Sequence, residues 1–182
     1  MMVLNDCMDK EISRLAYGVT FNKESFYHTW SHTLRVARYA AMIYQSESYE
    51  EEKFPEILVA SYFHDTGRIF DAFDGEHGYR SVQILDACKD RLSFEFDIDS
   101  VRFAILNHSE RRGEAGALPV VENFERDESI DKRIAACLWD ADRLDLLRLP
   151  FVTEINPEYL NTRTARDYAN TTEHLKIYNK DL

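Results

Sequence analysis

Four side chains that can bind a metal ion stand in strongly apolar segments of this sequence: His32, the adjacent pair His64-Asp65, and Asp142. An ionised carboxylate or an unpaired imidazole is costly to bury without a partner. Histidine nitrogens and aspartate oxygens that come together from distant parts of a chain suit a divalent cation. These four residues therefore predict a metal site.

Two further histidines stand in similar settings. His77 opens a predicted helix, and His108 continues the apolar stripe Val101, Ala104 and Ile105 at the end of another. A lone histidine on such a stripe is more often a satisfied core residue than a ligand. Four of the six histidines lie at apolar helix ends or on a helix face that we expect to line a site, and this joint pattern favours a second metal ion.

Each part of this pattern also has a structural interpretation. The pair His64-Asp65 could close its helix through a hydrogen bond between the two side chains. Asp142 could form a buried salt bridge to Arg143 or Arg148. The neighbouring Asp140 and Asp145 are expected to point away from Asp142 as surface charges.

The elements that must position these residues are helices. Apolar residues recur at helical spacing, and no run shows sustained period-two alternation with β-branched residues. We predict helices at 8–18, 24–46, 55–65, 77–91, 98–109, 128–148 and 164–178. Pro55 suits a first helical turn, and Gly67 and Gly113 suit chain breaks after the third and fifth helices. The fold class expected is all-α, a compact single-domain bundle over residues 1–182.

The predicted helix 24–46 has two different faces. Its core stripe consists of Phe26, Trp30, Thr33, Ala37, Ala40 and Tyr44, and its opposite stripe of His28, His32, Arg35 and Tyr39. The second stripe could be a solvated polar face. Apolar neighbours of that stripe favour partial burial instead, so we expect it to line a site.

Composition limits the classes of partner. The formal net charge of −11 disfavours nonspecific binding to nucleic-acid polymers or to anionic membranes. It permits a small anionic substrate if arginines gather in one pocket. Three widely spaced cysteines, no apolar run of membrane-spanning length and no signal-peptide core lead us to expect a reducing, cytoplasmic compartment. The oligomeric state is left open.

The order of these motifs resembles the HD superfamily of metal-dependent phosphohydrolases. The matching strings are YHTWSHTLRV with His32, YFHDTGR with His64-Asp65, and LWDADRLDL with Asp142. The resemblance runs from about residue 27 to 146 and implies a helical bundle. Residues 150–182 lie outside the resemblance, and we expect them to form a helical extension. It implies that His32, His64, Asp65 and Asp142 hold one metal ion.

The resemblance to binuclear members of this superfamily extends to His77 in EHGYRSVQIL and His108 in ILNHSER. It implies that Asp65 bridges two divalent ions, which makes Asp65 part of the catalytic machinery. The identity of the ions (Mn, Mg, Fe, Co, Ni or Zn) is not readable. His28, in the string His28-x-x-x-His32, is similar to the histidine of cyclic-nucleotide phosphodiesterases that protonates the leaving oxygen. A histidine that orients a ligand is the alternative role.

The function expected is hydrolysis of a nucleotide or another small phosphate ester by a metal-activated hydroxide. His28 is the candidate general acid, and Arg35 and Arg68 are candidate substrate contacts. The loops 70–76 and 111–122 are expected to border the pocket. A small HD-fold di-iron oxygenase that cleaves C–C or C–P bonds is the alternative, because the same ligands suit iron. A non-catalytic sensor or binding module is a third.

Overall fold

The structure is a computed structural model, and it describes residues 2–20, 25–49, 51–109, 120–125 and 127–169. Within these ranges all regular secondary structure is helical, which confirms the all-α prediction. The α-helices are α1 (Met2–Val19), α2 (Trp30–Ser46), α3 (Phe54–Phe63), α4 (His77–Cys88), α5 (Ile98–Asn107), α6 (Lys132–Asp145) and α7 (Arg163–Ala169). Short 3-10 turns are η1 (Glu51–Lys53), η2 (Lys89–Arg91), η3 (Val121–Asn123), η4 (Leu146–Arg148) and η5 (Pro157–Tyr159).

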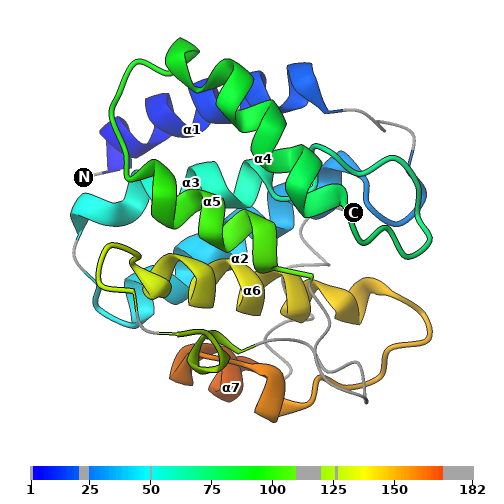
Figure 1. The fold of residues 1–182 in the computed structure, drawn as a ribbon. Coiled ribbons are helices and arrows are strands. Elements are labelled where there is room, and N and C mark those ends of the chain that lie inside the picture. The colour runs from blue at the N-terminus through cyan, green and yellow to red at the C-terminus, as the bar shows by residue number, and fades with distance from the viewer. Residues whose placement is uncertain (1, 21–24, 50, 110–119, 126, 170–182) are drawn as a thin grey trace.

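Helix α3 is the central element of the bundle. Every residue from Glu56 to Phe63 is buried, and Pro55 lies in its first turn, as predicted. A helix that is apolar all round must be covered on every side. Helices α1, α2, α5 and α6 all pack against α3, while α7 lies at the opposite end of the molecule from α1 (Figure 1). The carboxyl end of α3 therefore lies in the interior of the bundle.

The second predicted helix, 24–46, begins later than expected. Residue 24 lies outside the described residues, and α2 starts at Trp30 because Thr29 is its N-cap and accepts a hydrogen bond from the backbone N–H of His32 at 3.3 Å. The preceding segment is not helical, since the carboxylate of Asp71 accepts hydrogen bonds from the backbone N–H groups of Phe26 and Tyr27 at 2.7 and 3.2 Å. The prediction that placed His28 one helical turn before His32 is wrong.

The stripes predicted on this helix are also partly wrong. Phe26, assigned to the core, is exposed and lies outside α2, whereas Tyr39, on the stripe opposite the core, is fully buried. Helix α2 packs against both α3 and α6, so it has two covered sides. A projection of one helix cannot show that its second face meets another helix.

Other helix boundaries shift for local reasons. The helix predicted at 128–148 starts at Lys132 because Asp131 caps it, and it continues as η4. The helix predicted at 77–91 ends at Cys88 and continues as η2. Helix α7 is described as far as Ala169, so the remainder of the prediction at 164–178 lies outside the described residues, as does the break at Gly113.

Two glycines allow unusually close contacts around the end of α3. A Cβ atom at Gly67 would lie 2.5 Å from the backbone nitrogen of Ser81 in α4. A Cβ atom at Gly78 would lie 2.8 Å from the carbonyl oxygen of Leu106 in α5. Because nothing larger than hydrogen fits at either position, these glycines bring the start of α4 against both α3 and α5.

The segment that follows η5 is anchored on α6. Asp140 accepts hydrogen bonds from the backbone and side chains of Asn161 and Thr162, at 2.7 to 2.8 Å. The expectation that Asp140 is a surface charge is wrong, because its side chain is fully buried. Burial raises the pKa of Asp140 against the effect of these hydrogen bonds. Among the described helices, none has the length and apolar character needed to cross a membrane.

Candidate metal centre

The six side chains predicted as metal ligands meet in the interior of the bundle. They come from five parts of the chain: His32 in α2, His64 and Asp65 just after α3, His77 at the start of α4, His108 just after α5, and Asp142 in α6. All are buried except Asp142, which is partly accessible. The helix ends thus position the ligands, as the sequence suggested.

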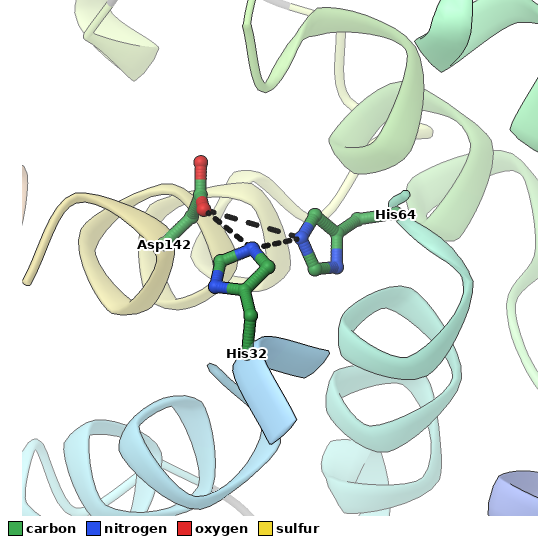
Figure 2. A group of neighbouring side chains, drawn as sticks. All are labelled: His32, His64 and Asp142. Carbon is green, nitrogen blue, oxygen red and sulfur yellow. Dashed lines mark hydrogen bonds and ion pairs between the residues drawn. The ribbon is translucent and has the colours of Figure 1, made fainter. Parts of the chain in front are cut away.

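The first ligand group consists of His32, His64, Asp142 and one carboxylate oxygen of Asp65. The Nε2 atom of His32 lies 3.3 Å from both Nε2 of His64 and Oδ1 of Asp142 (Figure 2). His64 Nε2 lies 4.0 Å from the same Asp142 oxygen. Oδ2 of Asp65 lies 3.6 Å from each of the two imidazole nitrogens.

The second ligand group uses the other oxygen of the same carboxylate. Oδ1 of Asp65 lies 3.2 Å from Nε2 of His77 and 3.5 Å from Nε2 of His108. These two nitrogens lie 2.9 Å apart. Each oxygen of Asp65 therefore faces its own pair of imidazoles.

All four imidazoles are oriented by a hydrogen bond at their outer nitrogen, Nδ1. The Nδ1 atoms of His64, His77 and His108 donate to the backbone carbonyls of Ser61, Asp74 and Ile105. His32 Nδ1 lies 2.6 Å from Oδ2 of Asp145. A carbonyl only accepts, so Nδ1 of His64, His77 and His108 carries the proton, and the Nε2 atoms of these three rings present lone pairs to the interior.

This donor set fits divalent metal ions. Ligands about 2.1 Å from an ion stand roughly 3.0–3.4 Å from one another, close to the separations measured here. The inward lone pairs of His77 and His108 lie on atoms 2.9 Å apart and repel one another unless a cation or a hydrogen-bond donor engages them. The side chains of His32, His64 and Asp142, all in the first group, lie close enough together to bind a metal ion. So do His64, Asp65 and His108, which join the first group to the second. The interpretation of His64-Asp65 as a simple helix-closing pair does not describe this geometry.

The electrostatics of the two groups differ. Burial disfavours charge on His32, but hydrogen bonds to Asp142, Asp145 and Asp65 outweigh it and raise the pKa of His32 to about 10. Burial lowers the pKa of His64 to about 4, and burial together with the His108 charge lowers that of His77 to about 3. The carboxylates around His32 thus favour positive charge in the first group, and they should favour the binding of a cation there.

Asp145 is the residue behind the first group. It is fully buried, so the expectation of a surface charge is wrong. Arg35 donates to it through Nε at 2.7 Å and Nη2 at 3.2 Å, and Arg148 Nη1 lies 3.0 Å away. Although burial opposes ionisation, the hydrogen bonds from His32 and Arg35 lower the pKa of Asp145. Arg35, predicted to contact substrate, is thus directed at Asp145 and is not among the residues described as lining the cavity below.

A cavity of about 290 Å³ leads from the surface to the ligands Asp65, His77, His108 and Asp142. Its wall includes the cationic side chains of Arg68, Arg143 and Arg148, and the exposed ring of Phe73 stands on it. The prediction that loop 70–76 borders a pocket agrees with this wall. Most of the loop at 111–122 lies outside the described residues.

His28 also lines this cavity, although it reaches it from the segment before α2. Its Nδ1 lies 3.1 Å from Oδ1 of Asp71, which also binds the hydroxyl group of Ser25. Burial lowers the pKa of His28, against the effect of Asp65 and of the hydrogen bond to Asp71. Sequence reasoning did not single out Asp71, and it took Asp145 for a surface charge. For Asp145 a signal existed, since it lies three residues after Asp142 on the same helix, whereas Asp71 is joined to His28 only by the fold.

Comparisons with known proteins agree with this geometry. The family model described as "HD domain" matches residues 29–147. A solved structure, the crystal structure of a predicted HD superfamily hydrolase from an uncultured Thermotogales bacterium, is similar with a TM-score of 0.60. It shares 20% sequence identity over 94% of this chain and 88% of its own, so it supports the fold. No curated protein matches the sequence. The match of the family model over more than half of the sequence shows that this chain belongs to the HD-domain family.

Proposed function

We propose that this protein is a metal-dependent phosphohydrolase that acts on a nucleotide or another small phosphate ester at a centre of two divalent ions. The observation that carries the proposal is Asp65, whose two oxygens face separate imidazole pairs beside a cavity whose wall includes Arg68 and Arg148.

The two ligand groups divide the work of metal binding. His32, His64 and Asp142 would hold one ion and His77 with His108 the other, with Asp65 shared. When bound, such ions supply Lewis acidity at phosphoryl oxygens and lower the pKa of a nucleophilic water. The hydrogen bonds at each Nδ1 keep the imidazole rings oriented, which costs no reorganisation during the reaction.

The cavity wall supports an anionic substrate. Arg68 and Arg148 line it and can donate hydrogen bonds to phosphate oxygens. Four carboxylates line it as well, so divalent ions bound at the ligand groups would have to supply the positive charge that an anionic substrate needs in a chain of net charge −11. Phe73 lies at the same cavity with 77% of its side chain exposed. An accessible aromatic face suits a nucleobase by stacking, and this favours a nucleotide over a simple sugar phosphate.

His28 is the group best placed for proton transfer to a leaving oxygen. Its Nδ1 is held by Asp71, so Nε2 is the atom left for the cavity. The hydrogen bond to Asp71 raises the pKa of His28, so Asp71→Asn should lower that pKa. Activity that needs protonated His28 would then fall at lower pH than in the wild type. A profile of kcat/KM against pH that is identical in Asp71→Asn and wild type would contradict this role.

Elemental analysis of the purified protein, combined with a panel of nucleoside monophosphates, sugar phosphates and phosphodiesters, tests the proposal. We expect divalent metal and phosphate release that is lost with a chelator and restored by adding the metal. Oxygen uptake with bound iron and no phosphate release would overturn the hydrolase assignment in favour of a di-iron oxygenase. Binding of a phosphate ester by metal-free protein, with no turnover of that ester, would favour a binding module.

A further inference from the structure

We propose that Arg68 is an internal competitor of the second metal ion, so that an anionic substrate, by engaging Arg68, promotes occupancy of the second ligand group. This inference rests on the proposed function and adds a regulation of the same centre. It concerns a contact between a guanidinium and two of the second group's own ligand atoms.

Arg68 uses the lone pairs that the second ion needs. Its Nη2 lies 2.9 Å from Nε2 of His77, and its Nε lies 3.1 Å from Oδ1 of Asp65. Since Nδ1 of His77 donates to the carbonyl of Asp74, Nε2 is an acceptor and receives a hydrogen bond from Nη2 of Arg68. Nε2 of His77 has a single lone pair, so an ion bound to it and the hydrogen bond from Arg68 exclude one another.

The two ligand groups differ in charge in a way that makes this competition one-sided. The first group has a carboxylate of its own, Asp142, besides the shared Asp65. The second group has the shared carboxylate alone and carries the permanent charge of Arg68 beside it. Ser109 adds a neutral hydroxyl 3.2 Å from Nε2 of His77. The first ion should therefore bind tightly and the second weakly.

Arg68 also has an alternative partner within reach. It lines the cavity that would receive the substrate, and a guanidinium binds phosphate through two parallel hydrogen bonds. Once Arg68 engages a phosphate, the lone pairs of His77 and Asp65 are released. Because coupling between two binding sites is reciprocal, phosphate must raise the affinity for the second ion by the same factor as the ion raises that for phosphate.

Calorimetric titration of metal-free protein with Mn²⁺, with and without inorganic phosphate, tests this inference. We expect two binding steps in the wild type, the second about tenfold or more weaker, and phosphate should strengthen that second step by about the same factor. In Arg68→Gln the second step should tighten without phosphate and lose its response to phosphate. Arg102→Gln removes a partly exposed arginine of α5 that pairs with Asp86 and Asp99, and it controls for the change in net charge.

The outcomes separate the inference from the function on which it rests. Two steps of equal affinity, unaffected by phosphate or by Arg68→Gln, would overturn the inference and leave the binuclear centre intact. Absence of any Mn²⁺ binding would overturn both. If Arg68→Gln does not fold, the phosphate response of the wild type decides alone: a second step indifferent to phosphate overturns the inference.

Discussion

The two ligand groups around Asp65 use the same residue types but are built differently. In the first group, His32 is oriented by the buried carboxylate of Asp145, with Arg35 and Arg148 behind it. In the second, His77 and His108 are oriented by backbone carbonyls. A carboxylate partner makes an imidazole a more basic ligand than a carbonyl does. The comparison predicts a strong site backed by charges and a weaker one backed by the main chain.

The positions of the two groups depend on different forces as well. The first is placed by the broad packing of α2, α3 and α6. The second depends on two close approaches, at Gly67 and Gly78, that tolerate no side chain. Packing over a large surface averages small changes, whereas a backbone contact fails at a single added methyl group. The second group should be the more easily broken.

The largest expected effect comes from Asp65, the carboxylate that joins the groups. Asp65→Asn removes the charge that the two proposed ions would share. We expect loss of the second ion, weaker binding of the first and about a 10³-fold lower kcat, since metal ions contribute several kcal/mol to transition-state stabilisation. Metal content and phosphatase kinetics measure this. Retention of two ions with near wild-type activity would contradict the shared role of Asp65.

Asp145 tests the charge that backs the first group. Asp145→Asn should lower the affinity for the first ion about 10- to 100-fold, because it weakens the orientation of His32. Asp140→Asn is the matched control, since Asp140 is equally buried on α6 but binds Asn161 and Thr162. It should reduce stability and leave metal affinity unchanged. Equal loss of affinity in both variants would mean that Asp145 acts only through folding.

Gly78 tests the main-chain contact that places the second group. Gly78→Ala should lower the free energy of unfolding by about 1–3 kcal/mol, because the new Cβ would meet the carbonyls of Leu106 and Ile105. The same clash should move His77 away from His108. Denaturant unfolding and metal titration should show lower stability and loss of the second ion with the first retained.

Gly18→Ala in α1 is the control for Gly78→Ala. A Cβ atom at Gly18 meets nothing within 4 Å, so this variant should gain up to about 1 kcal/mol of helix stability. Loss of both ions together in Gly78→Ala would show that the groups are not separable.

The smallest expected effect is a pH dependence of the metal-free protein. The pKa of His77 falls to about 3, so the unfolded state binds its proton first and stability decreases as pH falls below about 6.5. The pKa of His32 rises to about 10, so its contribution is present below about 6.5 and is lost as pH rises through 10. Urea midpoints from pH 5 to 10 should pass through a maximum. His77→Gln should flatten the acidic side, and an unchanged acidic side would contradict the assignment.

The sequence was sufficient to predict the helical class, the central buried helix and the convergence of the six ligand residues. The helical class and the buried helix follow from local periodicity and apolar segments. The ligand set rested on residue types together with the resemblance to the HD superfamily. It was not sufficient for the surroundings of the ligands. The start of α2 depends on Asp71, more than forty residues away from His28, and the burial of Asp140 depends on a segment that follows η5. Hydrogen bonds of this range are made by the fold and leave no local pattern.

Arg35 shows the same limit for a charged residue. It lies one helical turn from His32, and that spacing suggested a substrate contact. The structure directs it to Asp145, a residue 110 positions later in the chain. The helix spacing correctly placed Arg35 on the same side of α2 as His32. Its partner, Asp145, lies on another helix and could not be predicted from the sequence of α2 alone.

The central claim is that Asp65 is shared by two ions, and anomalous scattering from crystals grown with Mn²⁺ and phosphate tests it most directly. We predict two anomalous peaks about 3.5–4 Å apart, one beside each oxygen of Asp65. The first peak should lie among His32, His64 and Asp142, and the second against His77 and His108. A single peak, or two peaks that do not share Asp65, would contradict the account.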